Sequence, residues 1–246
     1  MFRFALVVLF AATVAAAQKK EPEKKKDQPK ILYSVPLAVV PGEKQKLVLR
    51  GKFLDSVKDV KVSGADGAKV KVLGGKKTPA GNNQPGERLG DTELEIELEL
   101  PKDAKPGVAL IASDSATYAL LLPDVAPSVK EKEPNDGFDA AQAIPFPCAV
   151  DGSIKGERDT DVFKFEGKKG TKVRIEVIAA RFGSPVDAFL SLYDADRKLL
   201  AAVDDVDGSP DPIINLTLPR DGTYFITVLD AHDLGGPQFG YRLLVK

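Results

Sequence analysis

The chain has 246 residues, with 35 lysine and arginine residues against 36 acidic ones, so its formal net charge is −1. This balance removes any strong argument for nucleic-acid binding, which relies on a basic surface. The single cysteine, Cys148, excludes an intrachain disulfide framework and is expected to be a small buried hydrophobe. Tryptophan is absent and aromatic residues make up 7%, which argues against a sugar-binding face built from flat rings.

Residues 1–17 predict a secretory signal peptide. A positive Met1-Phe2-Arg3 start precedes an apolar run from Phe4 to Val14, and Ala15-Ala16-Ala17 provides a small-residue exit. The run is too short to cross a bilayer, which takes about 20 apolar residues. We therefore expect cleavage after Ala17 and a secreted or periplasmic protein. No cysteine lies near that position to carry a lipid anchor.

Residues 18–30, QKKEPEKKKDQPK, contain no apolar side chain that could be buried, and predict a disordered lysine-rich tether. A solvated spacer is the simpler interpretation, and a polybasic contact with an anionic envelope surface is the alternative.

Residues 31–125 predict an Ig-like β-sandwich. Short apolar or alternating runs are separated by Pro-Gly and Gly-Gly turns, and the run from Glu93 to Leu100 alternates strictly between acidic and apolar residues. Strict alternation is typical of a sheet with one buried and one solvated face. The segment from Lys76 to Asp91 is rich in Gly, Asn and Pro and is expected to be a long exposed loop or hairpin tip.

Residues 126–246 predict a second β-sandwich of the jelly-roll kind, so the expected fold class is all-β. The segment from Ala126 to Lys130 is interpreted as the join between the domains, and the segment from Phe138 to Ile144 as one or two helical turns. Strand patterns then recur across roughly 100 residues, which is the density of a sandwich or jelly roll. The expected strands are Val150–Ile154, Val162–Phe165, Lys172–Ile178, Ala188–Tyr193, Leu199–Val203, Ile213–Leu218, Thr223–Leu229 and Tyr241–Val245.

The most informative segment is the acidic one between the two halves. In an extended chain, side chains two apart point the same way, so Glu131, Glu133 and Asn135 can converge. Clustered oxygen ligands suit a hard cation, and Ca²⁺ takes about six to eight of them. A local interpretation stays open, in which Asp136 caps a helix, Asn135 makes an Asx turn and the two glutamates are solvated.

Two other segments are weaker candidates. Asp204-Asp205-Val206-Asp207-Gly208 lacks the spacing of an EF-hand and is better explained by a hairpin turn between Val203 and Ile213. The only histidine, His232, could join Asp230 or Asp233 in a weak surface zinc site, but a loop before the last strand is the simpler interpretation.

The sequence does not favour an enzyme. It has no Gly-x-Ser-x-Gly elbow, and any serine or cysteine nucleophile would have to use His232 as its base. An acid pair as in a glycosidase remains open by residue type alone, although the aromatic-lined cleft that such enzymes need is not indicated.

The second half resembles the bacterial pre-peptidase C-terminal (PPC) domain. The resemblance implies an antiparallel β-sandwich that is non-catalytic, is found in secreted proteins, is often appended to peptidases and serves targeting, substrate contact or secretion. The segments that carry it are Glu133–Asp136, Ala140–Ile144, Val150–Ile154, Asp159–Phe165, Gly170, Asp187–Asp194, Gly222–Val228 and Gly240–Val245.

Related collagen-binding modules of clostridial collagenases carry Ca²⁺ on an acidic segment before the first core strand. By position, the resemblance implies a metal site whose ligands come from that segment and from the loop that folds over it, with Ser153 as a weaker candidate. Arg158 departs from the pattern, since those modules tend to place another acid there. The implied ligands are Glu131, Glu133, Asn135, Asp136, Asp159 and Asp161.

The first half is similar to Ig-like modules of the IPT/TIG type, on the strength of its Pro-Gly and Leu-x-Leu-x-Gly opening. Taken together, the sequence predicts a secreted, non-catalytic binding, targeting or scaffolding protein in which Ca²⁺ rigidifies the acidic interdomain segment. Its expected partner is an extracellular or envelope protein or polysaccharide. The alternatives are a peptidase-associated accessory protein, a carbohydrate-binding module or, least favoured, an unrecognised hydrolase.

Overall fold

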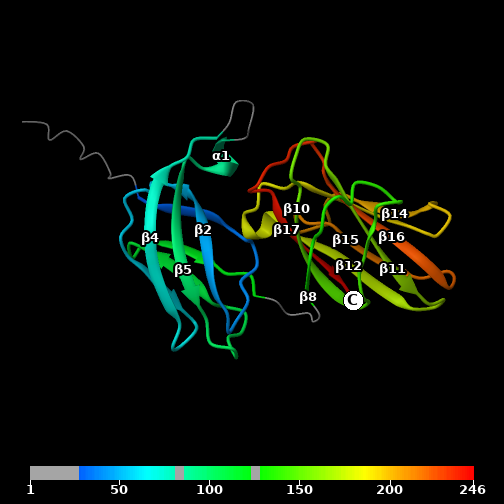
Figure 1. The fold of residues 1–246 in the computed structure, drawn as a ribbon, viewed down its shortest axis with the longest axis horizontal. Coiled ribbons are helices and arrows are strands. Elements are labelled where there is room, and N and C mark those ends of the chain that lie inside the picture. The colour runs from blue at the N-terminus through cyan, green and yellow to red at the C-terminus, as the bar shows by residue number, and fades with distance from the viewer. Residues whose placement is uncertain (1–27, 81–85, 123–127) are drawn as a thin grey trace, which may run out of the picture.

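The computed structural model describes residues 28–80, 86–122 and 128–246, and the expected signal peptide and most of the tether lie outside them. The described part is almost entirely β-structure, arranged as two bodies side by side (Figure 1), which confirms the all-β prediction. Its helical segments are two short ones, α1 (Gly86–Leu89) and η1 (Ala180–Phe182). None of its helices has the length and hydropathy of a membrane span.

The first body consists of two antiparallel sheets. One has the order β1-β2-β5-β4 and the other β3-β6-β7. Between them lies one apolar core, so this half is a sandwich. The strands are β1 (Lys30–Val35), β2 (Lys44–Lys52), β3 (Val60–Ser63), β4 (Lys69–Lys77), β5 (Thr92–Glu99), β6 (Ala109–Ala112) and β7 (Ala116–Ala119).

Strand β5 shows why the alternating pattern folds this way. Leu94, Ile96 and Leu98 are fully buried in the core, whereas the glutamates between them face outward. Glu95 and Glu97 meet lysines of the neighbouring strand β2 at 3.1 and 2.8 Å. The apolar face drives sheet packing, and the charged face stays solvated.

The second body is a larger sandwich of two five-stranded sheets, with orders β15-β12-β17-β10-β8 and β14-β13-β16-β11-β9. The strands are β8 (Ser128–Lys130), β9 (Gln142–Ala143), β10 (Cys148–Ser153), β11 (Thr160–Gly167), β12 (Lys172–Ile178), β13 (Ala188–Tyr193), β14 (Leu199–Val203), β15 (Ile213–Thr217), β16 (Gly222–Asp230) and β17 (Gly240–Val245).

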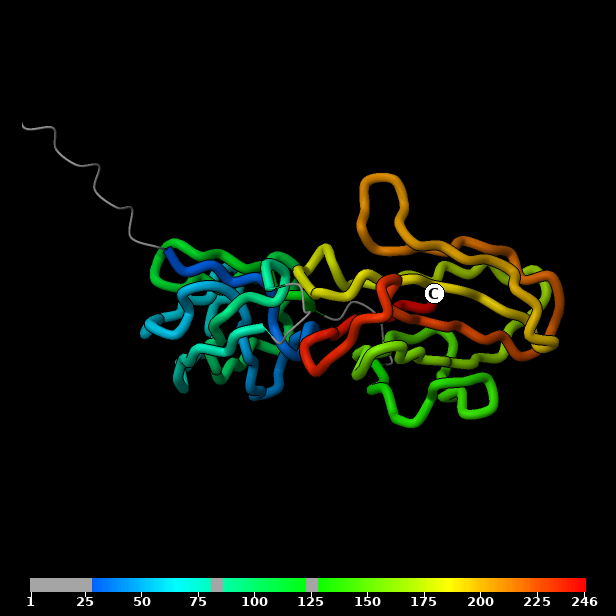
Figure 2. Tube along the Cα trace, turned by 90° about the horizontal axis from the view of Figure 1, so that it is seen from above, coloured from blue at the N-terminus to red at the C-terminus, as the bar shows by residue number. Residues whose placement is uncertain are grey.

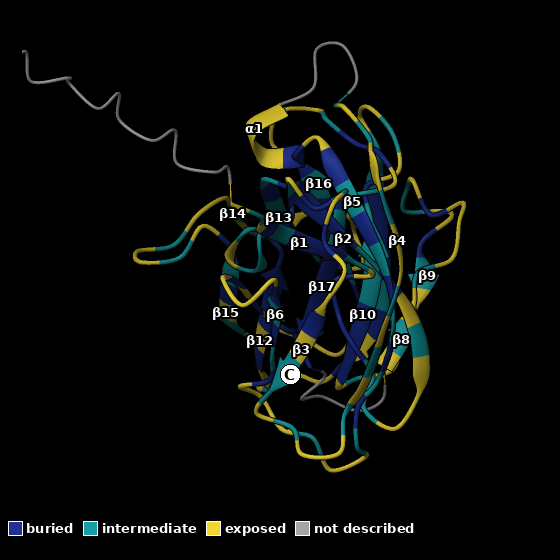
Figure 3. Cartoon of the chain, turned by 90° about the vertical axis from the view of Figure 1, so that its left-hand side faces the viewer, coloured by how far each residue is buried: buried dark blue, intermediate teal, exposed yellow. Residues whose placement is uncertain are grey.

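The core of this sandwich confirms the role expected for Cys148. Its side chain is fully buried among aliphatic and aromatic residues, including Phe163 and Phe165 of β11. Burial raises the pKa of the Cys148 thiol to about 11. In Figure 3 the central strands such as β17 are mostly buried, whereas the edge strands β4, β8 and β9 are largely intermediate or exposed.

The loop expected from Lys76 to Asp91 is wrong in part, since Lys76 and Lys77 belong to β4 and Leu89 of α1 is fully buried, and residues 81–85 lie outside the described part. Three further local predictions were wrong. The segment expected to form helical turns after Asp136 makes a single turn, with Ala140 N–H donating to Gly137 O (3.0 Å), and then strand β9. Its backbone finds a better partner at the edge of β11, with which β9 pairs in parallel. The residues 128–130 of the expected join form β8, which pairs in parallel with β10 and so belongs to the second sandwich. The residues 126–127 lie outside the described part.

The last of these wrong predictions concerns the hairpin between Val203 and Ile213. Strand β14 ends at Val203 and β15 begins at Ile213, but these strands lie in different sheets. The connection therefore crosses from one sheet to the other, with a tight turn between Val206 and Ser209. It projects from the second sandwich (Figure 2).

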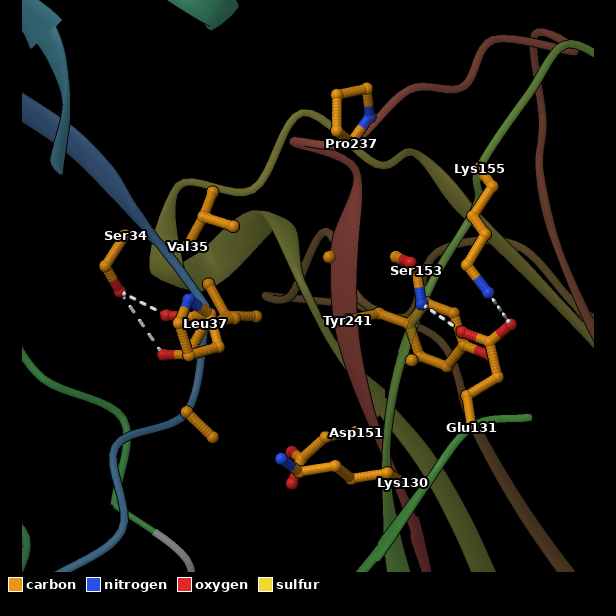
Figure 4. A pocket seen from close by; sticks show the side chains of 14 residues that line it. Ser34, Val35, Leu37, Lys130, Glu131, Asp151, Ser153, Lys155, Pro237 and Tyr241 are labelled. Atoms are coloured by element: carbon orange, nitrogen blue, oxygen red, sulfur yellow. Dashed lines mark hydrogen bonds and ion pairs between the residues drawn. The ribbon is translucent and has the colours of Figure 1, made fainter. Parts of the chain in front are cut away.

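The two sandwiches meet across an apolar contact. Leu37 and Leu121 of the first pack on Ala149, Ile178 and Leu244, which lie on the outer face of the second. In addition, the hydroxyl of Tyr118 donates to the carbonyl of Phe182, beside η1 (3.1 Å). The contact holds the residues 34–38 over strands β10 and β17, which are interior strands of their sheet (Figures 1 and 4).

A substitution at Gly183, which follows η1, would test the contact between the two sandwiches. It has φ +80°, and a Cβ there would lie 1.8 Å from the carbonyl oxygen of Leu32 in the first sandwich. We expect Gly183→Ala to separate the two bodies, seen as a larger radius of gyration in solution scattering and faster proteolysis between them. Gly170→Ala is the matched control, because Gly170 has φ +83° with nothing within 4 Å of its Cβ position. Both variants carry the backbone cost of about 1–2 kcal/mol, but only the first creates a clash. Equal scattering curves for the two would contradict the expectation.

Candidate metal centre

The acidic segment bridges the two sheets of the second sandwich. It begins after β8, in one sheet, and ends before β9, in the other. The N–H of Glu131 donates to the carbonyl of Asp151 on β10 (3.0 Å), and the carbonyl of Asn135 accepts from Val162 on β11 (2.9 Å). These bonds fix the segment across the open end of the sandwich, where β11 begins.

Carboxylates from both stretches meet at this end. One oxygen each from Glu131, Glu133 and Asp161 lie within 4.8 Å of one another, and so do single oxygens from Glu133, Asp136 and Asp159. Glu133 belongs to both groups. The structure therefore brings together all five carboxylates that the sequence singled out.

Two of the side chains are buried without the partners that burial demands. Asp161 and Asn135 are both fully buried, and Asp161 Oδ1, Asn135 Oδ1 and Asn135 Nδ2 have no hydrogen-bond partner. The other oxygen of Asp161 accepts a hydrogen bond of 2.6 Å from the hydroxyl of Tyr241. An unpaired buried carboxylate oxygen costs several kcal/mol unless it is protonated or bound to a cation.

Burial dominates the protonation of this cluster. It raises the pKa of Asp161 to about 8, with the nearby charges of Glu131 and Asp159 adding to the increase and the Tyr241 hydroxyl opposing it. Burial also raises the pKa of Glu131 and of Asp159. At Glu133 burial acts in the same direction, but the hydrogen bond and charge of Lys155 outweigh it, so the pKa of Glu133 is lowered.

Lys155 is the one cation among the described residues that forms ion pairs with the cluster. Its Nζ lies 3.2 Å from Glu131 Oε1 (Figure 4) and 2.9 Å from Glu133 Oε1. The backbone N–H of Ser153 donates to Glu131 Oε2 (2.7 Å), so Ser153 supports a candidate ligand through its backbone. Arg158 is exposed, and its side chain reaches Asp233 at 3.8 Å instead of the cluster.

The local interpretation of the segment fails in part. No helix follows Asp136, so there is nothing for it to cap. Of the two glutamates expected to be solvated, Glu133 is exposed, but the side chain of Glu131 is only 4% exposed. One local contact does form, since the N–H of Asn135 donates to Glu133 Oε2 (3.2 Å).

The donor set fits a hard divalent cation. Each of the two groups supplies three carboxylate oxygens, with Glu133 in both, so bidentate carboxylates or water would complete the six to eight ligands that Ca²⁺ takes. The orphaned oxygens of Asp161 and Asn135 are the groups that such an ion would satisfy. If Ca²⁺ is held here, it neutralises the carboxylates, while the chain's own residues fix their positions.

Sequence reasoning missed Lys155 and Tyr241. Lys155 follows the Gly152-Ser153 end of β10, where it looks like an ordinary surface lysine. Tyr241 pairs with Gly152 across β10 and β17, and a Cβ on Gly152 would lie 2.5 Å from the Tyr241 ring. The glycine in the Val150–Ile154 run was the available signal for such a close approach.

The weaker candidates are arranged differently from the predictions. Asp204 and Asp205 approach Asp187, not Asp207, with single oxygens within 4.8 Å. His232 Nδ1 lies 3.2 Å from Asp187 Oδ2. The side chain of Asp230 accepts the backbone N–H groups of His232 and Leu234, so it serves the loop that precedes β17.

A cavity of about 320 Å³ opens beside the cluster, between the two sandwiches. Its walls include the residues 34–38 of the first sandwich together with Glu131, Lys155 and Tyr241 of the second, which face each other across it in Figure 4. The acidic cluster thus reaches the domain junction through one member, Glu131.

Comparison with known proteins supports the resemblance of the second half. Residues 159–229 match the family model described as "Bacterial pre-peptidase C-terminal domain". A probable subtilase-type serine protease of Deinococcus radiodurans is 41% identical over 105 residues, which are 42% of this chain and 14% of that protein. The chain therefore spans about a seventh of the length of this curated relative.

Two solved structures show looser likeness. The pre-peptidase C-terminal domain of a Bacillus anthracis collagenase is 19% identical, with a TM-score of 0.37, over 47% of this chain and all of that one. PliG of Aeromonas hydrophila, a periplasmic inhibitor of g-type lysozyme, is 15% identical, with a TM-score of 0.30, over 48% of this chain and 96% of that one. At these TM-scores neither bears on function. The match over residues 159–229 confirms the predicted resemblance of the second half to the bacterial pre-peptidase C-terminal domain.

Proposed function

We propose that the chain is an exported, non-catalytic binding protein whose PPC domain is stabilised by a bound divalent cation, with Ca²⁺ as the expected ion. The observation that carries the proposal is the meeting of Glu131, Glu133 and Asp161 within 4.8 Å, with one Asp161 oxygen buried and unpaired. Like charges this close repel strongly, and a cation relieves both the repulsion and the burial cost.

The cation would tie the acidic segment to β11. Glu131 and Glu133 belong to the segment, whereas Asp161 belongs to the strand, so an ion bound to all three crosslinks them. The same segment lines the domain junction, so its order affects how the first sandwich is held. The metal is therefore structural in this proposal, and the binding surface is presented by the two sandwiches.

The proposal that the chain is non-catalytic has its own support. The only cysteine is buried, and its thiol pKa of about 11 makes it a poor nucleophile at neutral pH. The only histidine contacts Asp187 and belongs to neither group of clustered carboxylates. The relative from Deinococcus radiodurans matches over only 14% of its length, which fits an accessory module attached to a protease.

Calcium titration tests the metal. We expect Ca²⁺ to raise the melting temperature of the chelator-treated protein by several degrees, since an ion at about 100 times its Kd adds about 2.7 kcal/mol. Asp161→Asn is expected to abolish this increase. Asp139→Asn is the matched control, because Asp139 is an exposed acid of the same segment that pairs with Arg197 and lies in neither group of carboxylates. A melting curve indifferent to calcium and chelator would contradict the metal site.

The proposed partner is a protein outside the cytoplasm, with a secreted peptidase as the first candidate class. This rests on the PPC match and on the sequence pattern of the first 17 residues. Capture of a peptidase from the secreted fraction by the full chain, with Ca²⁺ and not with chelator, would support it. Retention on a glycan array instead would favour the carbohydrate-binding alternative.

A further inference from the structure

Lys155 already contacts two of the carboxylates that a metal would use. It follows strand β10, and its ammonium contacts one oxygen each of Glu131 (3.2 Å) and Glu133 (2.9 Å). These are two of the three carboxylates that converge with Asp161. A divalent cation that used all three would bring its two positive charges next to the ammonium.

We propose that Lys155 is a tethered competitor of the metal: it holds Glu131 and Glu133 together in the metal-free protein, and metal binding displaces its ammonium into the cavity between the two sandwiches. The inference rests on the proposed function and adds how the site is regulated. The unpaired Oδ1 atoms of Asp161 and Asn135 support it independently of the charges, because the ammonium leaves these two oxygens without a partner.

The charges favour displacement once a metal arrives. The ammonium brings one positive charge to a cluster of five carboxylates, and it pairs with only two of them. A divalent cation brings twice the charge and can reach the buried oxygen of Asp161. Both cations cannot keep the same oxygens, because two positive charges about 4 Å apart repel each other.

The structure gives the displaced side chain somewhere to go. Lys155 is half exposed and lines the cavity of about 320 Å³ that also contacts the residues 34–38 (Figure 4). Its backbone N–H donates to Asp159 Oδ2, so the stem stays anchored while the side chain rotates. No core packing has to change. Metal occupancy would therefore alter the charge that the second sandwich presents to the first.

Calorimetric titration of the full chain with CaCl₂ tests the competition. We expect Lys155→Met to tighten the calcium Kd about tenfold, because methionine keeps much of the length and removes the charge. Lys155→Arg keeps the competing charge and is expected to stay within about threefold of the wild type. Lys130→Met is the matched control, since Lys130 lines the same cavity but makes no ion pair among the described residues.

A second measurement separates competition from simple damage. In chelator, Lys155→Met should melt several degrees below the wild type, because Glu131 and Glu133 lose their counter-ion, and in excess calcium the difference should vanish. Equal calcium affinities for wild type and Lys155→Met would overturn the competition and leave the metal site standing. Weaker binding by Lys155→Met would show that Lys155 supports the metal. No calcium binding by either protein would refute the proposed function itself.

Discussion

In the presence of chelator, the protein is expected to lose stability as the pH rises from about 4 to about 8, and Asp161→Asn to remove most of this loss. Burial raises the pKa of Asp161 from 3.8 to about 8 in the folded protein. A carboxyl with a raised folded pKa contributes its full stability below its unfolded pKa, and loses it as the pH rises through the folded pKa. The sign is opposite to that of an ordinary salt-bridged aspartate.

The size of the expected loss of stability follows from the difference between the folded and unfolded pKa of Asp161. Moving from 3.8 to about 8 corresponds to about 6 kcal/mol at most, and proton sharing with Glu131 brings the expected loss to about 3 kcal/mol. Asparagine cannot ionise, so Asp161→Asn should make the free energy of unfolding depend less on pH. Some slope remains, because burial also raises the pKa of Asp211 and of Glu131.

Urea unfolding at a series of pH values in chelator checks this prediction. Saturating calcium should suppress the loss in the wild type, since the ion stabilises the ionised form, and should leave the variant unchanged. The variant Tyr241→Phe, measured in the same unfolding series, provides a further test. It removes the one hydrogen bond to Asp161, which favours the ionised form, and should therefore steepen the loss. Parallel profiles for wild type and Asp161→Asn would show that Asp161 is not the buried acid responsible.

The sequence predicted the strands well where one face of the sheet is apolar. The alternation from Glu93 to Leu100 appears as β5, and the runs from Val162 and Tyr241 appear as β11 and β17. Burial of alternate side chains drives these elements, and that pattern is local in sequence. The helical prediction for the segment from Phe138 to Ile144 was wrong because the segment's pairing partner is distant in sequence. The edge of β11 supplies hydrogen bonds that no local pattern reveals.

The residues of the candidate site likewise include some that the sequence predicted and some that it did not. Glu131, Glu133 and Asn135 could be singled out from their spacing, and the family resemblance added Asp159 and Asp161. The role of Lys155 could not be predicted, because its contact with the carboxylates depends on where the loop after β10 places its side chain. The burial that orphans Asp161 is likewise a tertiary property, because β11, β17 and the acidic segment all contribute to it.

The crossing between β14 and β15 shows a further limit. The sequence from Val203 to Ile213 contains good turn residues, and these do form a tight turn between Val206 and Ser209. Turn chemistry specifies the local bend but not which strands pair on either side of it. Here β14 pairs with β13 and β15 with β12, so the approach of Asp204 and Asp205 to Asp187 could not be read from spacing.

Asp151→Ala is expected to destabilise the protein by about 3 kcal/mol, whereas Arg242→Met should be neutral or slightly stabilising. Arg242 is fully buried and forms an ion pair with Asp151, yet its Nε and Nη2 have no hydrogen-bond partner. It alternates with Leu243 of the core and lies on the same face as Leu244, which packs against the first sandwich. The guanidinium therefore sits, partly unsatisfied, on the face that meets the first sandwich.

The asymmetry follows from what each substitution leaves behind. Removing Asp151 leaves a buried positive charge without compensation, which costs about 3–5 kcal/mol at fully buried pairs. The lower figure applies here, because the Asp151 side chain is 28% exposed. Removing Arg242 leaves an acid that reaches water and the hydroxyl of Ser128 (3.1 Å), and a methionine fills the space.

Urea unfolding of the two single variants and the double variant gives the coupling directly. The double variant should be about as stable as Arg242→Met, because Asp151 has little left to pair with once the arginine is gone. Equal losses for the two single variants would mean that the pair itself is stabilising. With the predicted inequality, the buried arginine lowers stability, and we expect its effect to be on how the two sandwiches are oriented. Solution scattering of Arg242→Met at full stability would then show an altered or broadened arrangement of the two bodies.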